Sequence, residues 1–302
     1  MKESRSALTR YDDFYAMLSD KVRHDAYEKA IKQVVKKGDV VLDLGAGTGI
    51  LGFMALKAGA KKVYLVEKSD SIELAKEIAK QNNFTDKISF INKNSLEVEL
   101  PEKVDVIVSE TLGSFGVDEN TLEFMIDARK RFLKEDGKII PEKLVVNIEP
   151  VESYESISKV DFWKSIGGID FSAAHQIFSQ KLMVEELKEE NVLAHSDPFC
   201  TIDFNTSQDP SLMSTTYHVM KKDGVVHGLG GWFDLQLTAD INISTKPSSP
   251  LTHWKQAFFP INNPINVSED DIMEIQMIVK PKGEGEFSDS TFIQYNYRCT
   301  QR

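Results

Sequence analysis

Residues 40–52, VVLDLGAGTGILG, constrain the fold of this chain more than any other stretch. An apolar run of buried-strand type enters a glycine-rich turn, and a helical pattern follows over residues 51–58. The next apolar run, KKVYLVEKS, ends at Glu67. This order predicts a βαβ unit whose turn faces a nucleoside ligand, with the Glu67 carboxylate placed to bond ribose hydroxyls.

The same alternation continues as far as residue 140. It predicts an N-terminal helical stripe within 11–36, helices over 71–81 and 122–133, strands over 88–92 and 104–108, and a short strand before Pro141. Strands and helices that alternate at these lengths predict an α/β fold, a Rossmann-like doubly wound parallel sheet.

After Pro141 the pattern changes to β-type alternation, as in LVVNIEPV and DIMEIQMIVKP. These segments predict a second, antiparallel β domain, a β-barrel or a sandwich. The expected domains are therefore residues 1–140, which would bind the nucleoside, and residues 141–302, a β-barrel domain that would bind the substrate. Residues 162–190 read as a charged helical excursion from the second domain, and long excursions of this kind often carry partner contacts.

Composition excludes several classes of protein. The 302 residues include 47 acids and 36 bases, a net charge of −11, which disfavours nucleic-acid binding through phosphates and favours a basic partner. No apolar run approaches the roughly 20 residues that cross a bilayer, and the first residues lack the apolar core of a signal peptide. Cys200 and Cys299 read as free thiols of a reducing compartment, so we expect a cytoplasmic protein. The six histidines show no metal-ligand spacing, and no metal site is expected.

Asp43 decides which nucleoside ligand the glycine turn suits. GTGILG at residues 47–52 matches G-x-G-x-x-G, a pattern shared with dinucleotide sites. However, Asp43 stands two positions before Gly45, and a carboxylate beside the turn would repel a pyrophosphate. It would suit a ligand with ammonium and sulfonium charges. S-adenosylmethionine has both, and it also has a ribose for Glu67, so we expect this cofactor and keep a dinucleotide as the alternative.

Two carboxylates follow the strand at 104–108 in the stretch SETLGSFGVDEN. Glu110 and Glu119 flank a short loop at the C-terminal end of that strand, where open α/β sheets bind ligands. A loop that turns back on itself can aim both acids at one cation, and a planar guanidinium suits such a pair best. In the alternative interpretation, Glu119 is a helix N-terminal acid favoured by the dipole, and Glu110 is a solvated loop charge.

Two further stretches contain residue types that bind anions or line sites. Arg23 is one of seven arginines in the chain, although it could also be a surface partner of Asp20 at i,i+3. His253 and Trp254 lie in the loop LTHWKQ, which is unusual for a structural turn, although a lone HW pair is also common in core packing.

Together these stretches resemble the protein arginine methyltransferases, class I enzymes that use S-adenosylmethionine, over nearly the whole chain. The matching pieces are Tyr11-x-x-x-Tyr15, MLSDKVRHDAY, VLDLGAGTGIL, Glu67, SETLGSFGVDE and THWKQ. The resemblance implies an N-methyltransferase that acts on arginine guanidinium groups in proteins or peptides. It also implies a homodimer, because residues 162–190 occupy the place of the family's dimerisation arm.

The resemblance also implies roles for individual residues. Arg23 would hold the methionine carboxylate and Glu67 the ribose. The remaining cofactor contacts would come from Asp43, Gly45, Ala46 and Gly47 on the methionine part and from Asn94 and Ser95 near the adenine.

On the substrate side, Glu110 and Glu119 would clamp the guanidinium, and Met17 would lie beside the accepting nitrogen. By the same resemblance, His253 would pair with Asp20 across the domain boundary, and Trp254 would wall the arginine channel.

The chain departs from the family pattern in three places. Many members recognise the adenine with an acid near the end of the third strand, where this chain has Asn94 and Ser95. Tyr15 and Met17 are nearly adjacent, which implies a short lid over the cofactor. The segment LGSF resembles family members that form symmetric dimethylarginine, whereas Met17 and THW resemble members that form asymmetric dimethylarginine. The resemblance therefore does not decide between the two products. The same cation clamp would also serve a small guanidine, an amine or a peptide natural product. The presence of both glutamates, His253 and Asp20 disfavours a third reading, a non-catalytic assembly subunit that binds the cofactor.

Overall fold

Five strands of the first lobe pair in parallel in the order β3-β2-β1-β4-β5. Their bounds are β1 Val40–Leu44, β2 Lys62–Val66, β3 Ile88–Ile91, β4 Val104–Ser109 and β5 Leu133–Ile140. All five residues of β1 are buried, because β2 and β4 flank it and helices pack over the sheet. The strand order reverses between β1 and β4, and the carboxyl ends of those two strands therefore form the crevice where such sheets bind ligands.

This computed structural model describes residues 11–282 and 291–301; residues 1–10, 283–290 and 302 of the two predicted domains lie outside that range. The helical elements of the first lobe are α1 Tyr11–Ser19, α2 Lys21–Val34, α3 Ile50–Ala58, α4 Ser71–Gln81, α5 Thr121–Phe132, η2 Thr85–Lys87 and η3 Ser95–Glu97. The predicted Rossmann-like sheet is confirmed. Within the described ranges, every helix is too short or not apolar enough for a membrane crossing.

The second lobe consists of two larger antiparallel sheets, with strand orders β10-β12-β16-β17 and β11-β6-β13-β15-β9, and β14 pairs with β13. Their bounds are β6 Lys143–Val151, β9 Met183–Glu185, β10 Ala194–His195, β11 Cys200–Asp203, β12 Leu212–Met220, β13 Gly224–Thr238, β14 Ile241–Ser244, β15 Gln256–Val267, β16 Ile272–Pro281 and β17 Thr291–Thr300; η5 is Glu189–Asn191. Tyr295 of β17 packs on Phe259 of β15 and donates to the Pro260 carbonyl, which joins the two sheets. The predicted antiparallel domain is confirmed.

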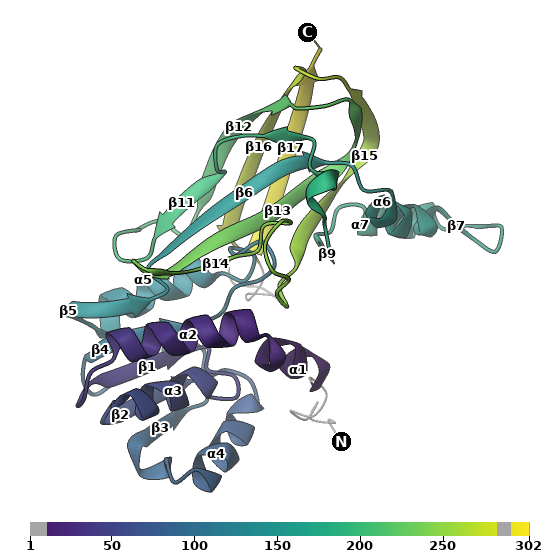
Figure 1. Cartoon of the computed structure of the whole chain (residues 1–302). Helices are drawn as coiled ribbons and strands as arrows, with labels where there is room; N and C mark the ends of the chain where they lie inside the picture. Colours follow the sequence, from purple (N-terminus) through teal and green to yellow (C-terminus); the bar gives the residue numbers. More distant parts are fainter. Residues whose placement is uncertain (1–10, 283–290, 302) are drawn as a thin grey trace.

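The two lobes share one hydrophobic core. A single cluster of buried apolar side chains runs from β1 and β4 into β13 and β15. Helix α2 lies between the lobes and contacts α3 on one side and β13 and β14 on the other (Figure 1). The predicted boundary between residues 140 and 141 falls in the short connection between β5 and β6.

The N-terminal helical stripe is broken at Asp20. The backbone of Asp20 is extended, with φ −68° and ψ 98°, and its carboxylate accepts a hydrogen bond from Arg23 N at 3.0 Å. An aspartate in this role caps the first turn of a new helix, and α2 therefore begins directly after it.

The prediction of a helical excursion over 162–190 was only partly right. The segment contains η4 Phe162–Lys164, the hairpin of β7 Ser165–Ile166 and β8 Ile169–Asp170, and α7 Ser172–Phe178 before β9; helix α6 Tyr154–Asp161 precedes it. Gly167 and Gly168 have φ of +61° and +79°, which no right-handed helix continues through, so the chain reverses there. Figure 1 shows α6, α7 and β7 projecting to one side of the antiparallel lobe.

Candidate active site

The glycine turn after β1 contacts both neighbouring strands. Gly45 N and Ala46 N donate to the Val66 carbonyl at the end of β2, at 2.9 and 3.0 Å. Gly45 has φ +72°, and a Cβ there would lie 2.3 Å from the Thr111 side chain. Glycine at this position therefore lets the turn approach the loop that follows β4 as well as permitting the left-handed backbone.

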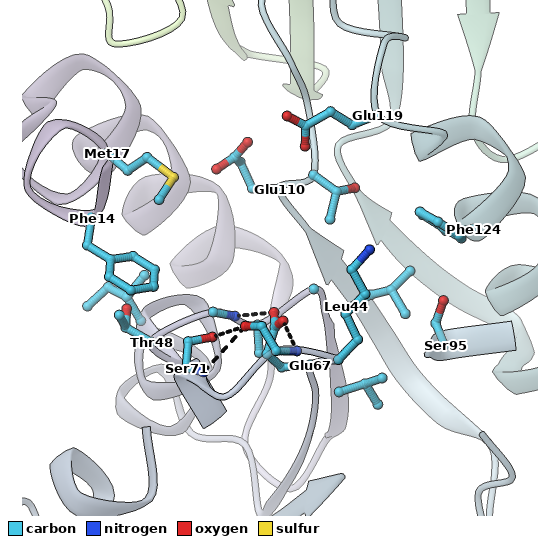
Figure 2. Close-up of a pocket in the computed structure, with 18 of the residues that line it drawn as sticks. Phe14, Met17, Leu44, Thr48, Glu67, Ser71, Ser95, Glu110, Glu119 and Phe124 are labelled. Carbon is cyan, nitrogen blue, oxygen red and sulfur yellow. Dashed lines mark hydrogen bonds between the residues drawn. The ribbon is translucent and has the colours of Figure 1, made fainter. Parts of the chain in front are cut away.

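A cavity of about 440 Å³ opens beside this turn, in the size range of small-molecule sites. Its wall comes from α1, the ends of β1, β2 and β4, residues 93–95, and the start of α5 (Figure 2). The cavity collects most of the predicted site residues: Met17, Arg23, Gly45, Ala46, Gly47, Glu67, Asn94, Ser95, Glu110 and Glu119. Residues up to 102 positions apart in the chain thus meet at the switch point of the sheet.

Glu67 lies on the cavity wall with both carboxylate oxygens engaged. Oε2 accepts from Gly47 N at 2.9 Å and Oε1 accepts from Ser69 N at 2.7 Å (Figure 2). These bonds fix the side chain against the glycine turn. Each carboxylate oxygen has a further lone pair, and Glu67 can therefore still accept from a ligand hydroxyl.

Glu110 is paired with Arg23. Arg23 Nε donates to Glu110 Oε2 at 2.8 Å, and a second guanidinium nitrogen reaches the same oxygen. The two side chains are 7% and 5% exposed. Although burial acts to lower the pKa of Arg23, the Glu110 charge raises it above its ordinary value. The alternative interpretation of Arg23 as a surface partner of Asp20 is therefore wrong, since only the backbone N–H of Arg23 bonds that carboxylate.

Glu119 faces the same part of the cavity from the other end of the loop. Figure 2 shows the Glu110 and Glu119 carboxylates directed into one space, with Met17 across from them. Glu119 is exposed, whereas the Glu110 side chain is buried, so one acid lies inside the cavity and the other at its mouth. We call these two side chains the carboxylate pair and residues 110–119 the acidic loop.

Asp43 lies behind the glycine turn, away from the cavity wall on which it was expected. Its Oδ2 accepts from Gly52 N at 2.8 Å, near the start of α3. The residue is 1% exposed, and burial raises the pKa of Asp43 to about 7. Its other oxygen, Oδ1, has no hydrogen-bond partner among residues 11–282 and 291–301. A strand residue two places before the turn points into the sheet packing, which explains the difference.

Asp20 and His253 pair across the two lobes. Asp20 Oδ2 accepts from His253 N and bonds His253 Nδ1, both at 2.9 Å. Burial acts to raise the pKa of Asp20, but the His253 and Arg23 hydrogen bonds bring it below its ordinary value. Both residues lie outside the cavity wall, so their contact joins α2 to the β lobe.

Trp254 packs behind the acidic loop, although it was expected to wall the arginine channel. The residue is buried, its Nε1 donates to the Leu112 carbonyl at 2.8 Å, and its ring packs on His253 and Phe233. Its polar atom is thus used to hold the backbone of the loop that bears the carboxylate pair.

The cavity also contains residues that the sequence interpretation left out: Phe14, Thr48, Ser71, Lys93 and Phe124 among others. Phe14 lies one turn before Met17 on α1 and shares its face, and that spacing could have identified it. Ser71 and Phe124 carried no signal, because each stands at the start of an ordinary helix. In the part of the chain that the structure describes, no three His, Cys, Asp or Glu side chains are grouped to hold a metal ion.

Comparison with known proteins matches both lobes to methyltransferases. Residues 143–300 match the arginine methyltransferase oligomerization subdomain, and residues 28–146 match ribosomal protein L11 methyltransferase (PrmA). Protein arginine N-methyltransferase 1.1 of Arabidopsis thaliana is 35% identical over 274 residues, which cover 88% of this chain and 70% of that protein. Protein arginine N-methyltransferase 1 of Saccharomyces cerevisiae is 32% identical, with 93% and 84% covered.

Solved structures show the same architecture over nearly the whole chain. The Trypanosoma brucei PRMT1 enzyme–prozyme heterotetrameric complex with AdoHcy superposes with a TM-score of 0.82 at 29% identity, and covers 97% of this chain and 99% of that one. Arabidopsis thaliana protein arginine methyltransferase 10 gives 0.79 at 28% identity, with 98% and 95% covered. With one cavity that holds a glycine turn, a strand-end acid and a pair of glutamates, and with these matches over both lobes, the chain belongs to the protein arginine methyltransferase family.

Proposed function

We propose that this protein transfers a methyl group from S-adenosylmethionine to the guanidinium nitrogens of arginine residues in proteins. The observation that carries the proposal is the presence of Glu110 and Glu119 in the same cavity as the glycine turn and Glu67. That arrangement supports a cation site beside a nucleoside site, as methylation of a guanidinium requires. The relatives bear the name of this activity, and one solved relative is a complex with AdoHcy.

The residues of the cavity fit the cofactor. Among the residues that the structure describes, a Cβ at Gly47 would meet only Phe14, 4.0 Å away, so the turn opens toward the cavity. Glu67 would accept from the ribose hydroxyls, and Asn94 and Ser95 line the region expected for the adenine. Arg23 would hold the methionine carboxylate while it keeps Glu110 in place. The bound cofactor supplies a methyl group activated by sulfonium.

The carboxylate pair would act on the guanidinium by charge and by position. At about 4 Å, and with an effective dielectric constant near 20, each carboxylate would interact with the cation by roughly 4 kcal/mol. Glu110 and Glu119 would hold positive charge on the nitrogens they contact and leave the remaining nitrogen richer in electrons. Fixed geometry would then supply much of the rate acceleration.

Arg23 and Leu112 orient Glu110 before any substrate binds. Oε2 is held by the Arg23 guanidinium, and Oε1 accepts from Leu112 N at 3.3 Å. Asp20 and His253 lie outside the cavity wall. We therefore propose that they hold α2 to the loop at residues 252–254, which we call the THW loop, and that they make no direct contact with the substrate.

The substrate that this site favours is an arginine side chain on a basic protein. The net charge of −11 attracts positively charged chains, and the exposed Glu119 leaves the acidic end of the cavity accessible to a side chain from outside. Cys200 and Cys299 are unpaired, which agrees with a reducing compartment, and the cytoplasm is our proposed location.

The β lobe matches an oligomerization subdomain, and we propose a homodimer that forms through residues 162–190, which we call the arm. The arm bears several exposed apolar side chains, among them Phe162, Ile169 and Ile177, at 56%, 64% and 59% exposure. Apolar side chains gathered on one projecting segment are typical of an association surface.

Methyl transfer from labelled S-adenosylmethionine tests the activity directly. We expect transfer to a Gly/Arg-rich peptide and none to the same peptide with lysine in place of arginine. If methyl transfer occurs only to free arginine or to small guanidines, the substrate is a small molecule, and the proposal of a protein substrate is wrong.

Glu119→Gln tests the carboxylate pair. This variant should bind AdoHcy in calorimetry as the wild type does, while turnover falls by about 10²- to 10³-fold because one charge at the cation site is lost. Wild-type turnover in Glu119→Gln would remove the carboxylate pair from the mechanism.

A further inference from the structure

The acidic loop is closed from the inside by a third acid, Asp118. Its Oδ1 accepts from Phe115 N at 3.0 Å, and the N–H groups of Ser114, Gly116 and Asp118 itself favour the charged form. A carboxylate that several backbone donors surround fixes the course of the chain around it. Asp118 immediately precedes Glu119, but it lies outside the cavity wall, and it therefore differs in role from the carboxylate pair.

Gly113 provides the space that the Asp118 carboxylate occupies. A Cβ on Gly113 would lie 2.3 Å from Oδ2 and 2.6 Å from Oδ1 of Asp118. The backbone φ of Gly113 is outside the left-handed region, so the conformation alone does not demand glycine. Glycine at this position leaves room for the Asp118 carboxylate, which packs directly against the backbone there. Gly116 N also donates to the Gly113 carbonyl at 2.9 Å and completes the turn.

This contact lies between the two members of the carboxylate pair. Gly113 follows Glu110 by three residues, and Asp118 adjoins Glu119. Holding Gly113 against Asp118 therefore draws the two ends of the acidic loop together. Glu110 and Glu119 are the charged groups of the loop on the cavity side, and the Thr121 hydroxyl provides a second link between the two ends by donating to the Thr111 carbonyl.

The β lobe fixes the outer side of the same loop. Trp254 Nε1 donates to the Leu112 carbonyl, and Thr291 Oγ1 donates to the Val117 carbonyl at 3.3 Å. Phe115, fully buried, packs edge-on against Phe259 at 5.0 Å between ring centroids. With the outside anchored in this way, the Asp118 carboxylate is the charged group that bonds the loop backbone from the inside.

The geometry points to Asp118 as the positioning residue that holds Glu110 and Glu119 at the separation that a guanidinium requires, with Gly113 as the residue that makes room for its carboxylate. This inference rests on the proposed function and names the residue that adapts the site to its substrate cation. Burial raises the pKa of Asp118 to about 6, so the carboxylate is charged at pH 8 and can accept from the surrounding N–H groups.

Four variants test this role: Asp118→Ala, Asp118→Asn, Gly113→Ala and the double variant Gly113→Ala/Asp118→Ala. We expect Asp118→Ala to lower kcat on the arginine peptide by about 10²-fold, the loss that a displacement of about 1 Å brings, with the Kd for AdoHcy unchanged within about twofold. Asp118→Asn keeps one acceptor oxygen and should recover part of that loss.

Gly113→Ala should be as impaired as Asp118→Ala, because its methyl group displaces the carboxylate. In the double variant, kcat should be no lower than in Asp118→Ala alone, because the carboxylate with which the added methyl group would clash is absent. Asp209→Ala is the matched control: Asp209 closes a turn in the β lobe by accepting from Ser211 N at 2.8 Å, and its loss should leave kcat unchanged.

The outcomes separate this inference from the proposed function. An active wild type with an equally active Asp118→Ala would overturn the inference alone. Equal loss of AdoHcy binding and kcat in all variants would show a structural role and would also overturn it. If Asp118→Ala does not fold, Asp118→Asn and Gly113→Ala decide by the same readouts. A wild type that neither methylates nor binds the arginine peptide in the presence of AdoHcy would refute both proposals.

Discussion

The buried Arg23–Glu110 pair shows how this protein uses single residues for two purposes. Two charges taken out of water require one another, because the remaining partner of a broken pair is a buried, uncompensated charge. Arg23 therefore serves the fold by neutralising Glu110, and its side chain also lines the cavity. The pair could not be inferred from sequence, since its members are 87 residues apart.

Arg23→Ala should unfold more easily and bind cofactor less tightly. Removal of one partner of a buried pair typically costs about 3–5 kcal/mol, and the same change removes the donor for the methionine carboxylate. Urea unfolding and AdoHcy calorimetry measure the two effects. Arg23→Ala/Glu110→Gln is the control: it should regain part of the stability but none of the cofactor affinity. An unchanged AdoHcy affinity in Arg23→Ala would contradict its assignment.

Asp43 should make the cofactor-free protein less stable as pH rises. Burial raises its folded-state pKa from 3.8 to about 7, so the folded state binds the proton more tightly than the unfolded state between those values. Stability is therefore lost from about pH 4 to pH 7, by an amount on the order of 2–4 kcal/mol. Asp43→Asn keeps an acceptor for Gly52 N and should lack this loss. Identical pH dependence of urea unfolding in both proteins would refute the assignment.

Among the elements, α2 connects the cavity to the β lobe. Its N-cap, Asp20, uses one oxygen for the helix and the other for His253, while Arg23 in the first turn reaches Glu110. Any movement of α2 therefore affects the cavity and the THW loop together. The arm shows a different principle: two glycines with positive φ broke a segment whose composition favoured a helix.

Substitutions of Asp20 should separate its two contacts. Serine caps helices about as well as aspartate but is too short to keep both bonds to His253. We expect Asp20→Ser to retain α2 and to raise KM for the arginine peptide, because the THW loop loses its anchor. Asp20→Ala should lose the same anchor and about 1 kcal/mol more stability, the value of the cap. Equal stability of the two variants in urea would mean that the cap contributes nothing here.

At the scale of the whole molecule, the two lobes work as one unit around the acidic loop. A single hydrophobic core continues from the parallel sheet into the β lobe, and Trp254 and Thr291 bond the loop backbone from the β side. The β lobe therefore holds the acidic loop in place and also bears the arm. We therefore expect that subunits associate through the arm, whereas the geometry of the cavity depends on the contacts between the acidic loop and the β lobe.

Ile169→Asp should convert the proposed dimer to a monomer. Ile169 is 64% exposed in the hairpin of the arm, and a charge there would have to be desolvated in an apolar interface. Light scattering at several protein concentrations measures the mass. Met213→Asp is the control, since Met213 is 72% exposed on β12 of the β lobe and should leave the mass unchanged. A dimer that survives Ile169→Asp would exclude this part of the arm from the interface.

The amino-acid sequence by itself determined the order of strands and helices, the glycine turn, the strand-end acid Glu67 and the loop with Glu110 and Glu119. These depend on local rules: hydrophobic period, turn residues, and the tendency of parallel sheets to bind ligands at the ends of their strands. Only the tertiary structure decided that Arg23 pairs with Glu110, that Asp43 and Trp254 lie behind the cavity, and that Asp118 closes against Gly113. Such contacts join residues whose separation in the sequence follows no repeating spacing, so no local pattern predicts them. The burial and pairing of charges likewise arise only when the chain is packed.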